Sequence, residues 1–265
     1  MHGLTLTYSG LNGIIKLLKG ERVMELKNLT ALITGAGGGI GRATATALAK
    51  EGVNLILFGG NNLEKLKTTE REVLSFGVKC KVIAGDLTDY DFIKNGAEQA
   101  VKEYDGIDIL INNAGVAANI PFEQTDDKTF DKIMAINARA PYLLTGALLP
   151  TLKKSKRASI INIASVVSHA GYANQSAYTA SKHALLGFTK SLAAEVYNDG
   201  IRVHAISPGG VYTDMVKISR PDLTPEGMIM PEEIADIVMF LLKNRGNAVV
   251  DEILVHRVNK QPFLV

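Results

Sequence analysis

The sequence has a single cysteine and almost no net charge, and these two scarcities exclude several classes of protein. With Cys80 alone among 265 residues, an internal disulfide bond is impossible, and its place in an alternating apolar run predicts a buried structural thiol. The net charge of +2 gives no reason to expect a nucleic acid or an anionic membrane as a partner. No apolar run reaches the roughly 18 residues of a membrane-spanning helix, and no secretory signature is present. We therefore predict a cytoplasmic protein.

Strand-like and helix-like segments alternate from Leu29 onward. Strands are predicted at Thr30–Thr34, Val53–Phe58, Val78–Ala84, Ile107–Ile111, Ser159–Ala164, Arg202–Ser207 and Val249–His256. Helices are predicted at Ile40–Glu51, Leu63–Phe76, Asp89–Tyr104, Phe130–Lys154, Ala177–Asn198 and Pro231–Lys243. This alternation predicts an α/β fold, a Rossmann-type doubly wound parallel sheet of about seven strands with helices on both faces. With no linker and no internal repeat, residues 24–265 are expected to form one domain.

Residues 1–23 precede this pattern and form a separate N-terminal extension. Apolar residues between Leu11 and Leu18 have helical spacing, but lysines interrupt them and no small-residue cleavage site follows. A signal peptide is therefore not expected. Three interpretations stay open: an ordered arm, a disordered tail, or an artefact of translation starting upstream of Met24.

Ser165, Tyr178 and Lys182 form the most informative candidate site. Tyr178 and Lys182 are four residues apart in a predicted helix and so share one face. An ammonium beside a phenol lowers the phenol pKa, which makes Tyr178 a candidate general acid and base. Ser165 ends a predicted strand, from which its hydroxyl can hold a carbonyl oxygen. The spacing alone proves little, because Tyr90 and Lys94 repeat it without an upstream serine, and Tyr90 is interpreted as an ordinary helix-start aromatic.

A glycine-rich loop joins the first predicted strand to the first predicted helix. It reads Thr34-Gly35-Ala36-Gly37-Gly38-Gly39-Ile40-Gly41. Glycines let a backbone approach a pyrophosphate, and a helix N-terminus presents N–H donors to it. The strand–loop–helix context therefore predicts a dinucleotide site.

Several further segments follow in a fixed order: Asp86 after the third strand, Asn112-Asn113-Ala114-Gly115 after the fourth, Asn137 in a helix, and Pro208-Gly209 with Val211 and Thr213. With the two motifs above, the chain resembles the short-chain dehydrogenase/reductase family over about residues 26–245. It is similar to the compact, single-domain 3-oxoacyl-[acyl-carrier-protein] reductases. The resemblance implies an NAD(P)(H)-dependent oxidoreductase that moves a hydride between nicotinamide and a carbonyl or secondary alcohol.

The resemblance also implies roles for individual residues. Tyr178 exchanges the proton with substrate, Lys182 lowers its pKa and binds the nicotinamide ribose, and Ser165 steadies the substrate oxygen. Asn137, through helix distortion and a water, links Lys182 to solvent. No metal is implied. The implied cofactor-binding residues are Thr34, Gly35, Gly37, Gly39, Ile40, Gly41, Gly60, Asn61, Asp86, Leu87, Asn113, Ala114, Gly115, Tyr178, Lys182, Pro208, Gly209, Val211 and Thr213.

The choice between NAD and NADP depends on the end of the second strand. A carboxylate there would bind a ribose 2′-hydroxyl and repel a 2′-phosphate, and Gly60 stands near that position instead. Gly38 and Asn61 occupy positions where NADP-using relatives often have Arg or Lys, and Arg42 is expected to pack elsewhere. The missing acid favours NADP(H) slightly over NAD(H).

The substrate end is predicted to be mainly apolar, lined by Val116, Ile120, Val167, Tyr172 and Met215. No Arg or Lys is evident at its floor, which argues against a small dicarboxylate. His169 is interpreted as a partly exposed loop residue and His183 as a residue of the helix surface or an interface. The short segment between Thr213 and Pro231 and the unusual tail from Val249 leave the substrate open.

Three functions remain at this stage: a 3-oxoacyl thioester reductase, a sugar, polyol or small-ketone dehydrogenase, and a non-catalytic regulator that binds the cofactor. The resemblance also implies a homodimer or homotetramer through the long helices, here Phe130–Lys154 and Ala177–Asn198.

Overall fold

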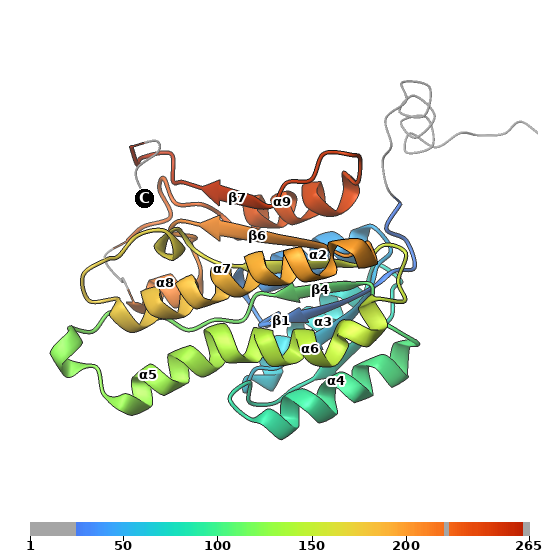
Figure 1. Ribbon diagram of the computed structural model, residues 1–265, viewed down its shortest axis with the longest axis horizontal. Helices are drawn as coiled ribbons and strands as arrows, with labels where there is room; N and C mark the ends of the chain where they lie inside the picture. Colours follow the sequence, from blue (N-terminus) through green and yellow to red (C-terminus); the bar gives the residue numbers. More distant parts are fainter. Residues whose placement is uncertain (1–24, 220–222, 262–265) are drawn as a thin grey trace, which may run out of the picture.

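The computed structural model describes residues 25–219 and 223–261. The N-terminal extension, residues 1–23, lies outside the described residues. One parallel sheet of seven strands organises the described part, in the order β3-β2-β1-β4-β5-β6-β7 (Figure 1). The strands are β1 Thr30–Thr34, β2 Asn54–Phe58, β3 Cys80–Ile83, β4 Ile109–Asn112, β5 Ser159–Ile163, β6 Arg202–Pro208 and β7 Glu252–Val255. The predicted doubly wound fold is confirmed.

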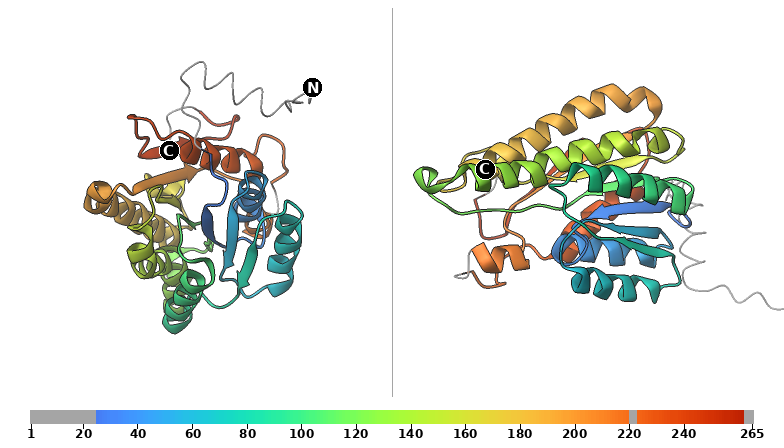
Figure 2. Two further views of the ribbon diagram at one scale, coloured as in Figure 1. Left: turned by 90° about the vertical axis from the view of Figure 1, so that its right-hand side faces the viewer. Right: turned by 90° about the horizontal axis from the view of Figure 1, so that it is seen from below.

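Helices cover both faces of the sheet (Figure 2). The longer ones are α2 Gly39–Lys50, α3 Leu63–Leu74, α4 Tyr90–Tyr104, α5 Asp127–Met134, α6 Ala140–Leu152, α7 Ser176–Val196 and α9 Pro231–Lys243. Short helical segments are η1 Phe122–Gln124, η2 Ala135–Arg139, η3 Val166–Ser168, η4 Tyr197–Asp199 and α8 Asp214–Ser219. None of the helices in this described part is long and apolar enough to cross a membrane.

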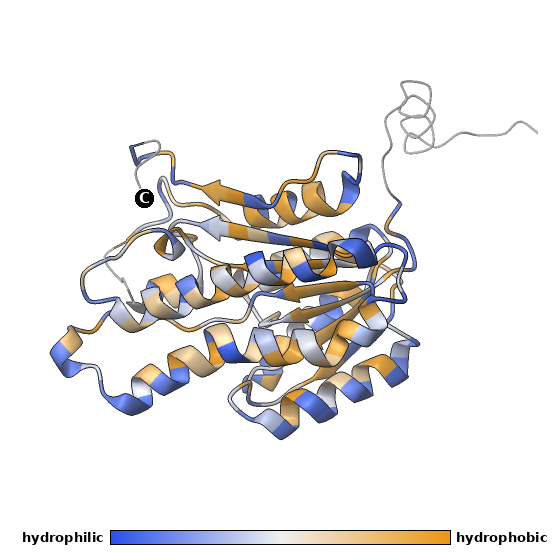
Figure 3. Ribbon diagram, viewed as in Figure 1, coloured by the Kyte–Doolittle hydropathy of each residue, from blue (hydrophilic) through white to orange (hydrophobic). Residues whose placement is uncertain are grey.

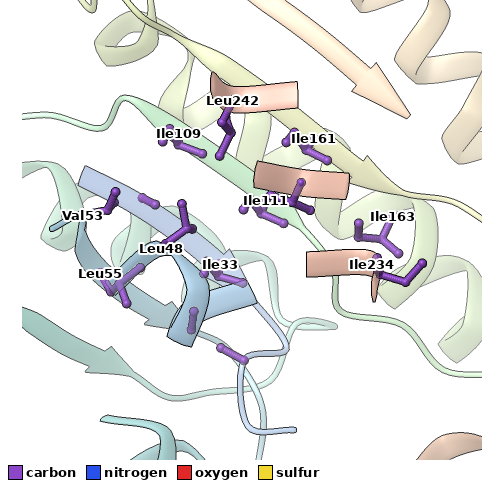
Figure 4. Packing of buried hydrophobic residues seen from close by; sticks show 14 of the residues in the cluster. Ile33, Leu48, Val53, Leu55, Ile109, Ile111, Ile161, Ile163, Ile234 and Leu242 are labelled. Atoms are coloured by element: carbon purple, nitrogen blue, oxygen red, sulfur yellow. The ribbon is translucent and has the colours of Figure 1, made fainter. Parts of the chain in front are cut away.

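Successive residues of each central strand belong in turn to one of two apolar clusters, one on each face of the sheet. Ile33, Ile111 and Ile161 pack with Leu48 of α2 and Ile234 of α9 on one face (Figure 4). On the other face, apolar side chains of the same strands pack against α4, α6 and α7. A parallel sheet buried on both faces needs strands that are apolar throughout, and the central strands have that character (Figure 3).

The prediction of one continuous α-helix over Phe130–Lys154 is wrong in the middle of the segment. The segment begins as α5, widens into the π-helical turn η2 and continues as α6. Inside that turn the Asn137 side chain accepts from the Val116 backbone N–H and donates to the Val116 carbonyl, both at 2.8 Å. The wide turn thus places a buried amide against the loop after β4, and such turns are frequent at functional sites.

Cys80 is only half-buried, at the start of β3. Burial and the nearby Glu70 raise the pKa of its thiol to about 12. A thiol that stays protonated is a poor nucleophile, which is consistent with the predicted structural role.

Candidate active site

A cavity of about 1240 Å³ opens at the edge where the parallel strands end. The sheet order reverses between β1 and β4, and ligands of doubly wound folds bind at such a switch point. The strand arrows, α8 and the segment after β7 meet on this side of the molecule (Figure 1). The cavity therefore lies where the glycine loop and the Ser–Tyr–Lys set were both expected.

The glycine loop after β1 is shaped by contacts that exclude side chains. A Cβ atom on Gly41 would collide with the Gly35 carbonyl oxygen, and one on Gly35 would lie 2.8 Å from the Ala114 Cα. Gly39 begins α2 with a φ of +50°, which favours glycine. The loop therefore brings its backbone and the N-terminus of α2 against the cavity, an arrangement that fits a dinucleotide pyrophosphate.

A hydrogen-bonded clamp joins this loop to the end of β4. The Thr34 hydroxyl accepts from the backbone N–H groups of Asn113 at 3.0 Å and Ala114 at 2.9 Å. In return the Asn113 side chain donates to the carbonyls of Thr34 and Gly35 at 2.9 and 3.2 Å. Thr34 and Asn113 thereby hold the two loops that would flank a dinucleotide in a fixed relation.

Ser165 and Tyr178 meet on the cavity wall next to Lys182. Ser165 follows β5 and its hydroxyl lies 3.4 Å from the Pro208 carbonyl. Tyr178 and Lys182 come from α7, and Ser165 lies near enough to the Tyr178 phenol to lower its pKa. The Lys182 ammonium donates to the Ile163 carbonyl at 2.7 Å and lies 5.9 Å from the centre of the Tyr178 ring. The three residues predicted from spacing therefore converge.

The electrostatics of the pair differ from the prediction. Burial raises the pKa of Tyr178, and the nearby Ser165 hydroxyl only partly offsets this. Burial also lowers the pKa of Lys182 to about 8. The predicted lowering of the Tyr178 pKa by the ammonium is thus wrong for the protein without cofactor, because both groups are withdrawn from water and neither forms a direct hydrogen bond with the other. A phenol that keeps its proton is the form that donates to a carbonyl oxygen.

Asn137 is fully buried behind this wall. Besides its bonds to Val116 it donates to the Ser181 hydroxyl at 3.0 Å, and Ser181 donates to the Tyr178 carbonyl at 2.7 Å. A Cβ placed on Gly115 would lie 3.4 Å from the Asn137 oxygen and 3.6 Å from the Lys182 nitrogen. Asn137 therefore flanks Lys182 across Gly115, in the distorted turn.

Most of the predicted residues line the cavity, and a few stand behind it. Thr34, Gly37, Gly41 and Asn137 do not line it and support residues that do. The predicted site residues on the wall are Gly35, Gly39, Ile40, Gly60, Asn61, Asp86, Leu87, Asn113, Ala114, Gly115, Ser165, Tyr178, Lys182, Pro208, Gly209, Val211 and Thr213.

The model of the family described as short chain dehydrogenase matches residues 29–224. The chain belongs to the short-chain dehydrogenase family. Its sequence is 32% identical to a 3-oxoacyl-[acyl-carrier-protein] reductase of Thermotoga maritima, over 87% of this chain and 97% of the relative. This short-chain dehydrogenase is an NAD(P)-dependent oxidoreductase.

Solved structures agree with that assignment. A metagenomic short-chain oxidoreductase in complex with NADP is 32% identical, with a TM-score of 0.78, over 89% of this chain and all of the other. Levodione reductase is 31% identical, with a TM-score of 0.79, over 87% of this chain and 96% of the other. These structures support the same family and the same cofactor class.

Four cations on the described cavity wall of this dehydrogenase escaped the sequence analysis, namely Lys65, Lys132, Arg257 and Lys260. Lys65, in the first turn of α3, lines the cavity beside Asn61 and pairs with Asp214 at 2.6 Å. The sequence offered one signal for this lysine: it stands three residues after Asn62, the N-cap of α3, in the first turn of the helix. Arg257, two residues past β7, also lines the cavity. The expectation of a substrate end without Arg or Lys is wrong, because the tail after β7 folds back over the loop that follows β6.

The remaining predictions for the substrate end hold with one exception. Val116, Val167, Tyr172 and Met215 line the cavity, whereas Ile120 does not. His169 is partly exposed and pairs with Glu252 at 2.7 Å. His183 is exposed on α7, with its ring nitrogen 3.0 Å from the Thr179 carbonyl. Arg42 packs away from the cavity, against Glu72.

Proposed function

We propose that this dehydrogenase reduces a carbonyl group of a small organic substrate with NADPH, with Tyr178 as the proton donor. The observation that carries the proposal is the convergence of Ser165, Tyr178 and Lys182 on one wall of the cavity, with Ser165 near enough to the Tyr178 phenol to affect its pKa. The bound cofactor supplies the hydride.

Each residue of the set has a distinct task in this proposal. Ser165 and Tyr178 donate hydrogen bonds to the substrate oxygen and so stabilise the negative charge that develops on it. Tyr178 then gives that oxygen its proton. Lys182 holds a ribose hydroxyl of the cofactor and places positive charge near the phenol, and Asn137 supports it from behind. In the reverse direction Tyr178 takes the proton from an alcohol.

The substrate is tested with a panel of carbonyl compounds and the oxidation of NADPH followed by absorbance. The panel contains a 3-oxoacyl thioester, cyclic and open-chain ketones, and keto sugars, and the matching alcohols and polyols are assayed with NADP⁺. The relative from Thermotoga maritima supports the thioester, and levodione reductase supports a small ketone. We expect turnover with at least one class. Tight NADPH binding without turnover across the panel would instead support a cofactor-binding regulator.

The preference for NADPH is assigned to Lys65. The loop between β2 and α3, residues 59–62, offers no carboxylate to repel a 2′-phosphate. Lys65 lines the cavity with Asn61 and has an exposed carboxylate partner, Asp214, that a phosphate can replace. A hydrogen bond to a charged group contributes about 1.5–3 kcal/mol, and loss of the exposed Asp214 pair reduces the net gain to about 1–2 kcal/mol. Solved relatives that hold NADP support this choice.

Replacing Lys65 by Gln is therefore expected to lower kcat/KM for NADPH by about 5–20-fold and to leave kcat/KM for NADH nearly unchanged. Initial rates with the two cofactors measure the ratio. Lys67→Gln removes the same charge from an exposed position of α3 that does not line the cavity, and is the matched control. Equal losses with both cofactors would show that Lys65 binds a phosphate common to them, and a wild-type preference for NADH would overturn the assignment.

Assembly as a homodimer or homotetramer also stays a proposal. Exposed aromatic residues on the long helices, among them Phe130 and Tyr142, support it.

A further inference from the structure

The segment that follows β7 carries an arginine into the substrate end of the cavity. The Gly209 backbone N–H donates to the Val255 carbonyl at 2.8 Å, which ties the tail to the loop after β6. Two residues later, Arg257 lies against Gly210: a Cβ there would be 3.4 Å from the arginine Cδ and 3.6 Å from its Nε. The Arg257 carbonyl accepts from the Lys260 backbone N–H at 3.0 Å and closes a turn. The arginine is therefore placed by backbone contacts on both sides.

Arg257 has no oxygen acceptor in the described part of the chain. The one described acceptor of the Arg257 guanidinium is the sulfur of Met228, at 3.2 Å, and a thioether is a weak acceptor. The other described arginines each donate to at least one oxygen: Arg42, Arg71, Arg139, Arg157, Arg202 and Arg245. A partly buried guanidinium without an acceptor is unfavourable, and a ligand that brings one removes the penalty.

The surroundings of Arg257 place it near the reacting groups rather than at the pyrophosphate loop. A Cβ on Gly209 would lie 3.9 Å from both the Arg257 backbone nitrogen and a methyl group of Val166, the residue after Ser165. The acidic residues of the described cavity wall are Asp86 and Asp214. Both are already engaged, Asp86 with the Thr88 backbone N–H and Asp214 with Lys65. Neither forms an ion pair with Arg257, so the arginine has no carboxylate partner on the described cavity wall.

We propose that Arg257 binds a carboxylate of the substrate, so that this dehydrogenase acts on oxo acids and the corresponding hydroxy acids. The inference rests on the proposed function, because it places the carbonyl oxygen between Ser165 and Tyr178 and the carboxylate at the other end of the same molecule. A guanidinium matches a carboxylate in shape and donates two parallel hydrogen bonds to it. His256 and Lys260 also line this part of the cavity and add no negative charge. A neutral thioester or diketone would leave the arginine unpaired.

The experiment compares four oxo acids with their methyl esters: 2-, 3-, 4- and 5-oxohexanoate. Acid and ester share the same carbonyl and differ in charge, and the series varies the distance from carbonyl to carboxylate. With NADPH, we expect the best acid to exceed its ester in kcat/KM by about 10–100-fold, as for a hydrogen-bonded charge pair. Arg257→Gln should abolish that preference and leave the rates with the esters within about two-fold.

Two further variants test whether the acid-over-ester preference depends on the planar guanidinium of Arg257 or on positive charge alone. Arg71→Gln makes the same replacement at an exposed position of α3 that does not line the cavity, and should keep the acid-over-ester preference. Arg257→Lys keeps the charge without the planar fork and should retain only part of the preference. NADPH affinity, measured for each variant, reports whether the fold and the cofactor site are intact.

A second measurement keeps the inference testable if nothing in the series is reduced. Binding of the four acids and esters to the NADPH complex of the Tyr178→Phe variant, followed by calorimetry, requires no chemistry. Binding of an acid that Arg257→Gln weakens by 10-fold or more would support the carboxylate site even where the proposed reduction fails. Equal binding of acid and ester, no binding of any acid, or an equal loss for acid and ester in Arg257→Gln would overturn it.

Discussion

Replacing Tyr178 by Phe should lower kcat for carbonyl reduction by about 10²–10⁴-fold, the range for the loss of a positioned general acid. The change removes one oxygen atom and leaves the ring in place on α7. Ser165 keeps its contact with the Pro208 carbonyl, so the cavity wall keeps its shape. The affinity for NADPH is therefore expected to stay within about two-fold, because no proposed cofactor contact depends on the phenol alone.

The chain contains its own control for this experiment. Tyr90 begins α4, is 57% exposed, and stands four residues before Lys94, the same spacing as Tyr178 and Lys182. Tyr90→Phe should leave kcat unchanged. Steady-state rates and NADPH titration of both variants give the comparison. Near-normal turnover of Tyr178→Phe would refute its role as proton donor, and an equal loss in both variants would point to an indirect effect.

The order of the strands and the place of the cavity could be predicted because each depends on local pattern. β1 was predicted at Thr30–Thr34 and is found there, since a short apolar run bounded by a lysine-containing turn and a glycine loop has few other structures. Ser165 follows β5, and its place in the cavity follows from the rule that ligands bind beyond the carboxyl ends of parallel strands. Tyr178 comes thirteen residues later in the first turn of α7, which begins at the same edge of the sheet.

The π-helical turn could not be predicted in the same way. Helical periodicity continues from α5 into α6, and one extra residue per turn at Ala135–Arg139 barely changes the pattern. The wide turn is held by a pair of hydrogen bonds between Asn137 and Val116, which is 21 residues distant. The place of Arg257 escaped prediction for a related reason, since its position depends on how the tail folds back after the last strand.

The ionisation of Tyr178 and Lys182 shows a further limit of reasoning from spacing. Four residues on a helix indicate that two side chains are neighbours, but they do not indicate how much water surrounds them. Lys182 is 4% exposed, and its burial lowers its pKa from 10.5 to about 8. Desolvation, rather than the attraction between neighbours, therefore dominates both groups in the protein without cofactor.

That desolvation predicts that Lys182→Met stabilises the protein while it removes activity. Below pH 8 Lys182 is charged in both the folded and the unfolded chain, and folding must desolvate the charge. Between about pH 8 and 10.5 the unfolded chain holds the proton more tightly than the folded one, so the wild-type free energy of unfolding should rise with pH. At pH 7 methionine avoids the penalty and loses the bond to the Ile163 carbonyl, for a net gain of about 1–3 kcal/mol.

Urea unfolding of wild type and Lys182→Met at pH 7 and pH 10 measures the difference, which should shrink at the higher pH. Lys94→Met, at an exposed position of α4, should show neither effect. In the same variants, carbonyl reduction should fall at least about 100-fold for Lys182→Met and stay normal for Lys94→Met. The prediction would be wrong if Lys182→Met were less stable than wild type at pH 7, or if their difference in free energy of unfolding did not change with pH. Either result would show that other interactions offset the desolvation penalty of the buried ammonium. A stabilised but inactive variant would show that this site keeps an unfavourable charge because its chemistry requires one.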